Sequence, residues 1–358
     1  MIVTGATLID ADGARAGDLF VARDRFAASA TGAGETIDAS SCYVVPGIVD
    51  LGVFAVERGA SAAGGITRVA LMPDQSPPLD DPGLVQRAAL AAKPVLWVHP
   101  LAAATKGLLG IELAEVALMA RAGAKAVATG RRSIADAGVM RRVLAYAHAL
   151  DLTVIAHAED AGLVGDAVAT AGETATLYGL SAAPAIAEAM VVARDLLLVE
   201  DTGARLHFRQ LTTARALDLV RHAKRQGLPV TCGITPAHLL LNEIAVGGYR
   251  SFARLSPPLR HEDDRLACLE ALRDGTIDVL CSGHDPRGPE AKRLPFADAE
   301  PGASGAETLM TLALGLVRDA VIDLPRLAAL TSANPSRLLG LDCGRLAVGA
   351  PADFAIVD

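Results

Sequence analysis

The chain has 358 residues, of which 51% are hydrophobic and 3% aromatic, and its formal net charge at pH 7 is −8. This apolar fraction is large enough for a full core and excludes a largely disordered chain. The negative charge argues against nucleic acid as a partner, and the lack of a long uncharged apolar run argues against a membrane span. The N-terminus lacks the pattern of a secretion signal, and five scattered cysteines without a C-x-x-C pair favour reduced thiols and a cytoplasmic location.

The two ends of the chain share a pattern of short strands separated by turns. Strands are predicted at 2–9, 18–21 and 43–45. Residues 344–358 return to the same pattern after a long stretch of different character. We therefore expect one small β-sandwich domain built from both termini, comprising residues 1–46 and 344–358.

Between residues 47 and 343, short apolar runs alternate with longer runs rich in alanine, leucine and arginine. The strand-like runs lie at 47–51, 67–72, 94–99, 124–128, 153–157, 205–210, 229–234 and 277–282. The clearest helical runs lie at 113–122, 138–149, 185–200, 213–226 and 263–274. Strands that are apolar on both faces and alternate with helices are typical of a closed parallel sheet. The pattern predicts an α/β fold in which residues 47–343 form a (β/α)₈ TIM barrel.

Several segments resemble one enzyme family when they are taken together. They are VVPGIVDLGVF at 44–54, AAGGITRVALMP at 62–73, LTVIAHAED at 152–160, RQLTT at 209–213, SPPLR at 256–260 and CSGHDP at 281–286. In this order they resemble the dihydroorotase, allantoinase and hydantoinase branch of the amidohydrolase superfamily, and most of all the bacterial dihydroorotases. The resemblance covers nearly the whole chain and implies an amidohydrolase-type TIM barrel with a β-sandwich domain.

The resemblance also implies where metal ligands should stand. Members of this family hold two metal ions at the mouth of the barrel, where the metal activates the attacking water. Six ligand positions carry over to this sequence, and they hold Gly52, Phe54, Thr129 or Gly130, His157, Gln210 and Gly283. Of these, His157 alone matches the family, and a lone imidazole does not make a zinc site. Zinc is therefore expected to be absent, and Gly283 replaces the aspartate that the family uses as catalytic base.

The substrate-binding positions differ from the family pattern as well. By resemblance, Val56 replaces an arginine that binds the substrate carboxylate, whereas Asp74 and Ser256 replace asparagines. The missing arginine and the carboxylate of Asp74 both disfavour an anionic ligand. Arg131, next to the bridging-ligand position, could fill the vacated metal site by charge replacement.

These losses predict that the chain is not an enzyme but a pseudoenzyme of the dihydroorotase family. The resemblance implies a structural or regulatory role in pyrimidine biosynthesis, in which the chain supports the assembly of aspartate carbamoyltransferase. The catalytic chain of that enzyme is the expected partner, in a homo- or hetero-oligomer.

Three other functions remain open at the sequence level. One is a cyclic amidohydrolase with a relocated or mononuclear metal site, formed by His157, His238, His284 and Asp285. Another is a module that binds a pyrimidine or nucleotide without turning it over. The third is nucleophilic catalysis by Cys281 with His284 as its base.

Overall fold

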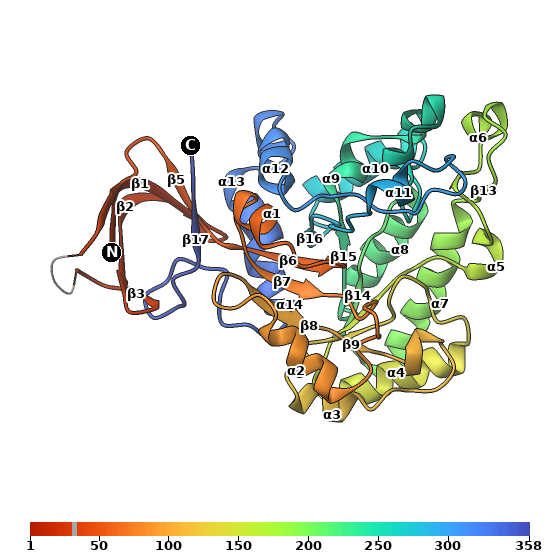
Figure 1. Cartoon of the computed structure of the whole chain (residues 1–358), viewed down its shortest axis with the longest axis horizontal. Helices are drawn as coiled ribbons and strands as arrows, with labels where there is room; N and C mark the ends of the chain where they lie inside the picture. Colours follow the sequence, from red (N-terminus) through yellow and green to blue (C-terminus); the bar gives the residue numbers. More distant parts are fainter. Residues whose placement is uncertain (31–33) are drawn as a thin grey trace.

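The computed structural model describes residues 1–30 and 34–358, which form a barrel with a twisted β-sheet against one side (Figure 1). The sheet has the strand order β17-β5-β1-β2-β3, and β4 pairs with β1. Its strands are β1 (Ile2–Asp10), β2 (Gly13–Ala22), β3 (Arg25–Ala27), β4 (Thr36–Asp38), β5 (Tyr43–Pro46) and β17 (Phe354–Val357). Strands from both chain ends therefore lie side by side in this sheet, and Val3, Leu8, Phe26 and Val44 form its core.

The barrel strands run parallel in two hydrogen-bonded arcs. One arc has the order β6-β7-β8 and the other β16-β15-β14-β11-β10-β9. The strands are β6 (Ile48–Val53), β7 (Ile66–Leu71), β8 (Trp97–Pro100), β9 (Ala102–Ala103), β10 (Val127–Ala128), β11 (Val154–Ala156), β14 (Leu206–Phe208), β15 (Val230–Ile234) and β16 (Val279–Leu280). Each except β9 overlaps a run predicted from the sequence, and the run at 94–99 appears as β8, shifted toward the C-terminus. These parallel strands with helices around them confirm the predicted α/β barrel.

Helices surround the strands and bury a second apolar layer between them. They are α1 (Arg58–Ala63), α2 (Pro82–Leu90), α3 (Val116–Arg121), α4 (Ala137–Ala149), α7 (Ile186–Thr202), α8 (Ala214–Arg225), α10 (Glu262–Arg273), α12 (Leu309–Arg318), α13 (Leu324–Ala328), η4 (Ala329–Ala333) and α14 (Asn334–Leu338). Asp81, Asp136 and Thr213 cap α2, α4 and α8 by accepting backbone N–H bonds. Successive side chains of a strand face opposite sides, so Val49 and Leu51 fill the barrel interior whereas Ile48 packs toward the helices.

Short elements follow several strands at the rim of the barrel. They are η1 (Lys106–Leu108), α5 (Ala161–Val164), β12 (Ala169–Thr170), α6 (Glu173–Leu177), β13 (Ala182–Ala183), α9 (Pro236–Leu240), η2 (Glu243–Tyr249), η3 (Ser251–Ala253) and α11 (Pro289–Lys292). Several of these, α6, α9 and α11 among them, lie along the upper side of the barrel in Figure 1. In the described part of the chain, no helix is long and apolar enough to cross a membrane.

A buried carboxylate joins the two arcs of the barrel. Asp50 of β6 accepts hydrogen bonds from the backbone N–H of Ser282, at 2.8 Å, and from the Ser282 hydroxyl. Nearby, the Phe54 N–H donates to the carbonyl oxygen of His284 at 2.9 Å. Burial raises the pKa of Asp50, although the Ser282 bonds oppose this shift. These bonds link β6 to the segment after β16 and bring the predicted site residues of both into one place.

Candidate functional site

Half of the predicted site positions border a cavity of about 730 Å³ at the carboxyl ends of the barrel strands. This is the end of a TIM barrel at which active sites form. Among the predicted positions, the cavity is bordered by Phe54, His157, Gln210, Ser256 and Gly283. Four arginines border it as well, namely Arg131, Arg132, Arg209 and Arg254.

The absence of a side chain at Gly52 leaves space for the side chain of Arg209. The backbone φ of Gly52 is +87°, and a Cβ added there would lie 3.1 Å from Cδ of Arg209. Glycine adopts this conformation without the steric cost that other residues incur. The methylene groups of Arg209 therefore occupy the space into which a ligand side chain at position 52 would project.

Phe54 is buried between two guanidinium groups. The Arg131 guanidinium lies 3.8 Å from the centroid of the Phe54 ring, and that of Arg209 lies 5.1 Å from it. The face of an aromatic ring attracts a cation at such distances. The Phe54 ring thus favours two positively charged guanidinium groups at the barrel mouth, where members of the resembling family hold metal ions.

The bridging-ligand position is occupied by a tight turn. Gly130 has a φ of +86°, and a Cβ there would lie 2.9 Å from Oδ1 of Asp74. The same oxygen accepts the Arg131 N–H at 2.9 Å, and burial raises the pKa of Asp74. The hydroxyl of the neighbouring Thr129 accepts the His157 N–H at 3.0 Å.

The turn directs Arg131 across the mouth to Asp285. Both guanidinium Nη atoms bond this carboxylate, with Nη2 at 2.8 Å from Oδ1. A second cation, Arg287, lies 3.1 Å from Oδ2 of Asp285. Arg131 thus lies over Phe54 and pairs with Asp285, while its role as a charge replacement for a metal stays a prediction. Asp285 is therefore engaged by two arginines.

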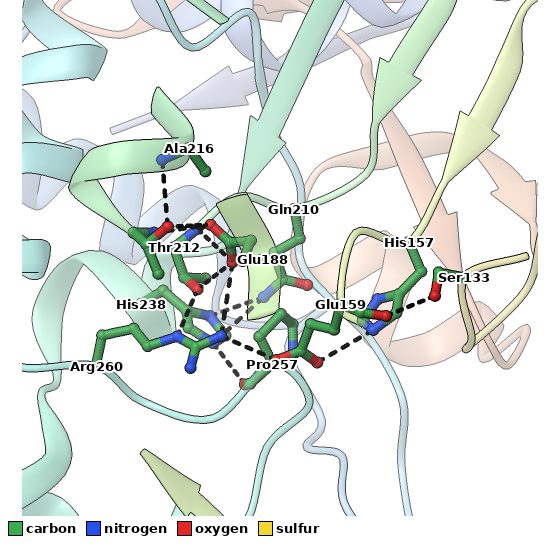
Figure 2. Close-up of polar contacts among 11 residues, drawn as sticks. Ser133, His157, Glu159, Glu188, Gln210, Thr212, Ala216, His238, Pro257 and Arg260 are labelled. Carbon is green, nitrogen blue, oxygen red and sulfur yellow. Dashed lines mark hydrogen bonds and ion pairs between the residues drawn. The ribbon is translucent and has the colours of Figure 1, made fainter. Parts of the chain in front are cut away.

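His157 is held in a buried polar network rather than in a cluster of metal ligands (Figure 2). Its Nε2 lies 3.1 Å from Oε2 of Glu159, whose other oxygen accepts from Arg260 at 2.9 Å. Burial alone would raise the pKa of Glu159, but His157 and Arg260 together lower it below its ordinary value. Glu159 is therefore an ionised partner that orients His157 and Arg260.

Gln210 and His238 form a second hydrogen-bonded pair beside this network (Figure 2). Nε2 of Gln210 lies 2.8 Å from Nδ1 of His238, and Nε2 of His238 lies 3.0 Å from the Pro257 carbonyl oxygen. A carbonyl can only accept, so Nε2 of His238 carries the proton and Nδ1 accepts. Burial lowers the pKa of His238 to about 4, which keeps the ring neutral.

Gly283 and His284 also lie at the barrel mouth, and neither provides a metal ligand there. Gly283 has a φ of +63°, and a Cβ there would lie 2.7 Å from Cγ2 of Thr235. The Nδ1 of His284 accepts two backbone N–H bonds, and its Nε2 lies 3.3 Å from a carboxylate oxygen of Glu57. Both ring nitrogens of His284 therefore lie near groups other than Asp285, which is bound by Arg131 and Arg287.

The residues at this mouth do not fit a pair of metal ions. Across residues 1–30 and 34–358, no three His, Cys, Asp or Glu side chains converge as a metal site requires. Arg209, Asp74 and Thr235 fill the space beside Gly52, Gly130 and Gly283. The proposed set of His157, His238, His284 and Asp285 is likewise spread over separate hydrogen-bonded groups.

The remaining predicted residues lie in different surroundings. Val56 packs against the layer between strands and helices, and Asp74 lies beneath the Gly130 turn. Ser256 borders the cavity and is exposed. Burial raises the pKa of Cys281 to about 12, so its thiol stays protonated and is not the activated nucleophile considered above.

Sequence reasoning missed the arginines at the core of the site. Arg209 and Arg260 are 5% and 3% exposed, although arginine is rarely buried without a partner. Glu188 is fully buried on α7 and binds Thr212 and Thr213 just after Gln210. The signal was present in RQLTT, where an arginine directly follows a buried strand.

The fold and this mouth together define a TIM-barrel protein of the amidohydrolase type. The L-hydantoinase of Arthrobacter aurescens superposes with a TM-score of 0.87 at 24% identity, over 99% of this chain and 85% of that one. Dihydropyrimidinase from Brevibacillus agri gives a TM-score of 0.82 over the same shares at 21% identity. At these identities the likeness concerns the fold, which has the predicted barrel and β-sandwich architecture.

Sequence comparison then gives the family. A family model described as dihydro-orotase-like matches residues 43–215. A dihydroorotase-like protein of Pseudomonas aeruginosa is 39% identical, with 99% of this chain and 89% of that protein covered. A dihydroorotase of Syntrophotalea carbinolica is 40% identical over 90% of this chain and 80% of its own length. The chain belongs to the dihydroorotase-like family, which confirms the resemblance seen in its motifs.

These comparisons contradict the prediction that the chain is not an enzyme. Relatives 38–40% identical to it are named dihydroorotases, and the similar structures are hydantoinases. The prediction inferred the loss of all activity from the loss of the metal ligands. The physical error lies in that step, because losing metal ligands removes the water activation and carbonyl polarisation that a metal supplies, but not the other side chains of the cavity.

Proposed function

We propose that the chain serves pyrimidine biosynthesis as a dihydroorotase-like subunit that supports the assembly of aspartate carbamoyltransferase, without a resident zinc ion. One observation carries the proposal. The family's framework persists along the chain, whereas its metal-ligand positions are filled by the packed side chains of Arg209, Asp74 and Thr235. A function compatible with both facts uses the fold and its surfaces rather than a metal pair.

An exposed apolar surface offers a place for a partner chain. It comprises Leu177 of α6, Ile244 and Tyr249 of η2, and Phe252 of η3, which are 53–77% exposed. The T-shaped contact between the Tyr178 and Tyr249 rings ties α6 to η2. Apolar patches of this kind mark interaction sites on soluble proteins, and their aromatic residues are enriched at interfaces. We assign this surface, formed by α6, η2 and η3, to the carbamoyltransferase catalytic chain.

The test is co-expression with the aspartate carbamoyltransferase catalytic chain of the same organism. We expect both chains to co-elute from size exclusion at a defined mass ratio, and the purified chain to hold well under one zinc per molecule. Ile244→Lys and Phe252→Lys should break the complex. Leu118→Lys is the matched control, because it is also exposed but lies on α3, far from α6 in Figure 1. Separate elution of the two unmodified chains, or two bound zinc ions, would refute the proposal.

The names of the relatives favour a second candidate, a cyclic amidohydrolase with a relocated or mononuclear metal site. In that case His157 and His238, the two imidazoles that border the cavity, would have to leave their present partners. Hydrolysis of dihydroorotate by the purified chain, followed while zinc is titrated, tests it. Turnover that saturates at one zinc and is lost in His157→Gln would support this candidate, and no turnover at any zinc level would remove it.

A further inference from the structure

Of the four arginines at the barrel-mouth cavity, Arg132, Arg209 and Arg254 have no carboxylate partner within 4 Å among the described residues, and the last two are not exposed. Arg131 is bonded to Asp285, and Arg132 is exposed. Arg209 and Arg254 take part in no ion pair within 4 Å in the described parts of the chain. Positive charge that faces a cavity without a counter-charge favours the entry of an anion.

Arg209 is the more deeply buried of the two. It is 5% exposed, and its one hydrogen bond to a side chain goes to the amide oxygen of Gln210, at 3.3 Å. Its Nε has no partner in the described structure. Burial lowers the pKa of Arg209, which reflects the cost of holding a charge away from water. An anion in the cavity would offset that cost.

Arg254 is half-buried where the chain leaves η3, beside Leu255 and Ser256. Its Nε also lacks a partner, although its carbonyl oxygen is fixed by the Gly302 N–H at 3.0 Å. The backbone is thus held in place while the guanidinium stays available. Burial lowers the pKa of this arginine as well.

The acidic residues near the cavity form no ion pair within 4 Å with these two arginines in the described parts of the chain, although the charges of Asp74 and Asp285 oppose the lowering of the Arg209 pKa. Glu159 is bonded to Arg260, and Asp285 to Arg131 and Arg287. Asp166 is exposed at the rim. Asp74, which disfavoured an anionic ligand at the level of the sequence, is covered by the Gly130 turn and is not among the residues that border the cavity. Of the two sequence arguments against an anionic ligand, the missing arginine at position 56 is answered by Arg209 and Arg254 at the cavity, and the carboxylate of Asp74 does not border it.

We propose that the barrel-mouth cavity binds a small organic oxyanion, a carboxylate or a phosphate ester, through Arg209 and Arg254. Guanidinium groups bind both kinds of oxyanion through paired N–H donors. A cavity of about 730 Å³ admits such a ligand with a ring-sized body. Phe54, Leu241, Leu255 and Leu312 supply an apolar wall for that body. This binding needs neither a metal ion nor a partner chain, so its test is independent of the assembly proposed above.

Calorimetric titration with benzoate, phenyl phosphate and neutral benzamide tests the proposal. These probes share one ring and differ in charge, so the two anions should bind and benzamide should not. Affinity should fall as salt increases. The stronger of the two anions identifies the headgroup class. Arg209→Gln and Arg254→Gln should each weaken anion binding by about tenfold or more.

A control variant distinguishes specific binding by Arg209 and Arg254 from nonspecific attraction of anions to positive charge on the protein. Arg141→Gln, at a residue that pairs with Asp201 on the surface, should leave affinity within about twofold. Circular dichroism and thermal melts verify that each variant is folded, and Arg254→Gln decides if Arg209→Gln does not fold. Equal binding of benzamide and benzoate, no binding of either anion, or unchanged affinity in a folded Arg254→Gln variant would overturn the proposal.

Discussion

Three glycines at predicted ligand positions have their space filled by side chains from elsewhere in the sequence. Arg209 packs over Gly52, Asp74 over Gly130 and Thr235 over Gly283, and all three glycines have positive φ. A side chain at any of these positions would meet both an occupied space and a disfavoured backbone conformation. The site is therefore more than a family site with donors removed, because its interior is packed in a different way.

Restoring a ligand at position 52 should consequently destabilise the chain without restoring a metal. Gly52→His forces an imidazole against Arg209 at a φ of +87°. We expect a loss of about 2–4 kcal/mol in the free energy of unfolding, from overpacking and backbone strain together. Urea unfolding measures it, and metal analysis should find no stoichiometric zinc.

Gly59 provides the control for this substitution. It lies in α1 with open space where a Cβ would stand, so Gly59→Ala should be neutral or stabilising by up to about 1 kcal/mol. A Gly52→His variant as stable as the parent chain, with one zinc bound, would contradict the packing described here.

The sequence predicted which ligand positions lack donors, because those positions follow from local motifs. It could not predict what fills them. Arg209 follows β14 and Gly52 lies in β6, so their contact depends on closure of the whole barrel. Buried pairs between residues far apart in the chain leave no local pattern.

At the scale of elements, Glu188 connects helix α7 to the turn between β14 and α8. Its carboxylate accepts the N–H and hydroxyl of both Thr212 and Thr213, at 2.6–2.9 Å. Its Oε2 also lies 3.7 Å from Arg260. Burial raises the pKa of Glu188, while Arg260 and the two threonines oppose this shift. This one side chain therefore holds the segment that carries Gln210 and Arg209.

Glu188→Ala should destabilise the chain by about 3–5 kcal/mol, because it leaves the buried donors of Thr212 and Thr213 without their acceptor and removes one of the two carboxylates near Arg260. Glu188→Gln keeps one acceptor oxygen and should cost less. Denaturant titration gives both values. Glu200→Ala, on the same helix but exposed, is expected to stay within about 0.5 kcal/mol of the parent chain. Equal effects at the two positions would show that Glu188 does not tie these elements together.

Elements with a clear apolar period could be predicted, whereas the short rim elements could not. Helix α8 was expected at 213–226 and spans Ala214–Arg225. By contrast, α5, α6 and η2 are too short to show a period, and η2 packs into a separate apolar cluster around Val168, Val246 and Phe296. They border the cavity or form the proposed partner surface, so the functional rim is the part that sequence reasoning describes least.

At the scale of the whole molecule, the terminal sheet and the barrel are joined by a partly buried ion pair. Arg68 of β7 contacts Asp353, next to β17, with 2.7 Å between Nε and Oδ2. The same arginine lies beside His99 of β8 and over the ring of Trp97. The predicted pairing of both chain ends in one sheet thus has a physical link to the barrel, and the boundaries at 46 and 344 remain predictions.

Buried neutral histidines make the stability of the whole fold depend on pH. Burial lowers the pKa of His99 and of His207 to about 3, and that of His238 to about 4. The folded chain leaves these rings uncharged, whereas the unfolded chain protonates them near pH 6.5. Burial of each ring therefore has no protonation cost above pH 6.5. The free energy of unfolding decreases as the pH falls from 6.5 toward the pKa of the ring in the folded chain.

His207 gives the sharpest test, because it is fully buried and its Nδ1 lies 2.8 Å from the Thr231 hydroxyl. Removing its titration in His207→Gln should flatten the pH profile of unfolding. Between pH 7 and pH 5 the parent chain should lose about 2 kcal/mol relative to this variant. His148→Gln, at an exposed position, should run parallel to the parent chain over the same range. Parallel curves for the parent and His207→Gln would mean that this ring titrates alike in the folded and unfolded chain, contrary to its burial inside the barrel.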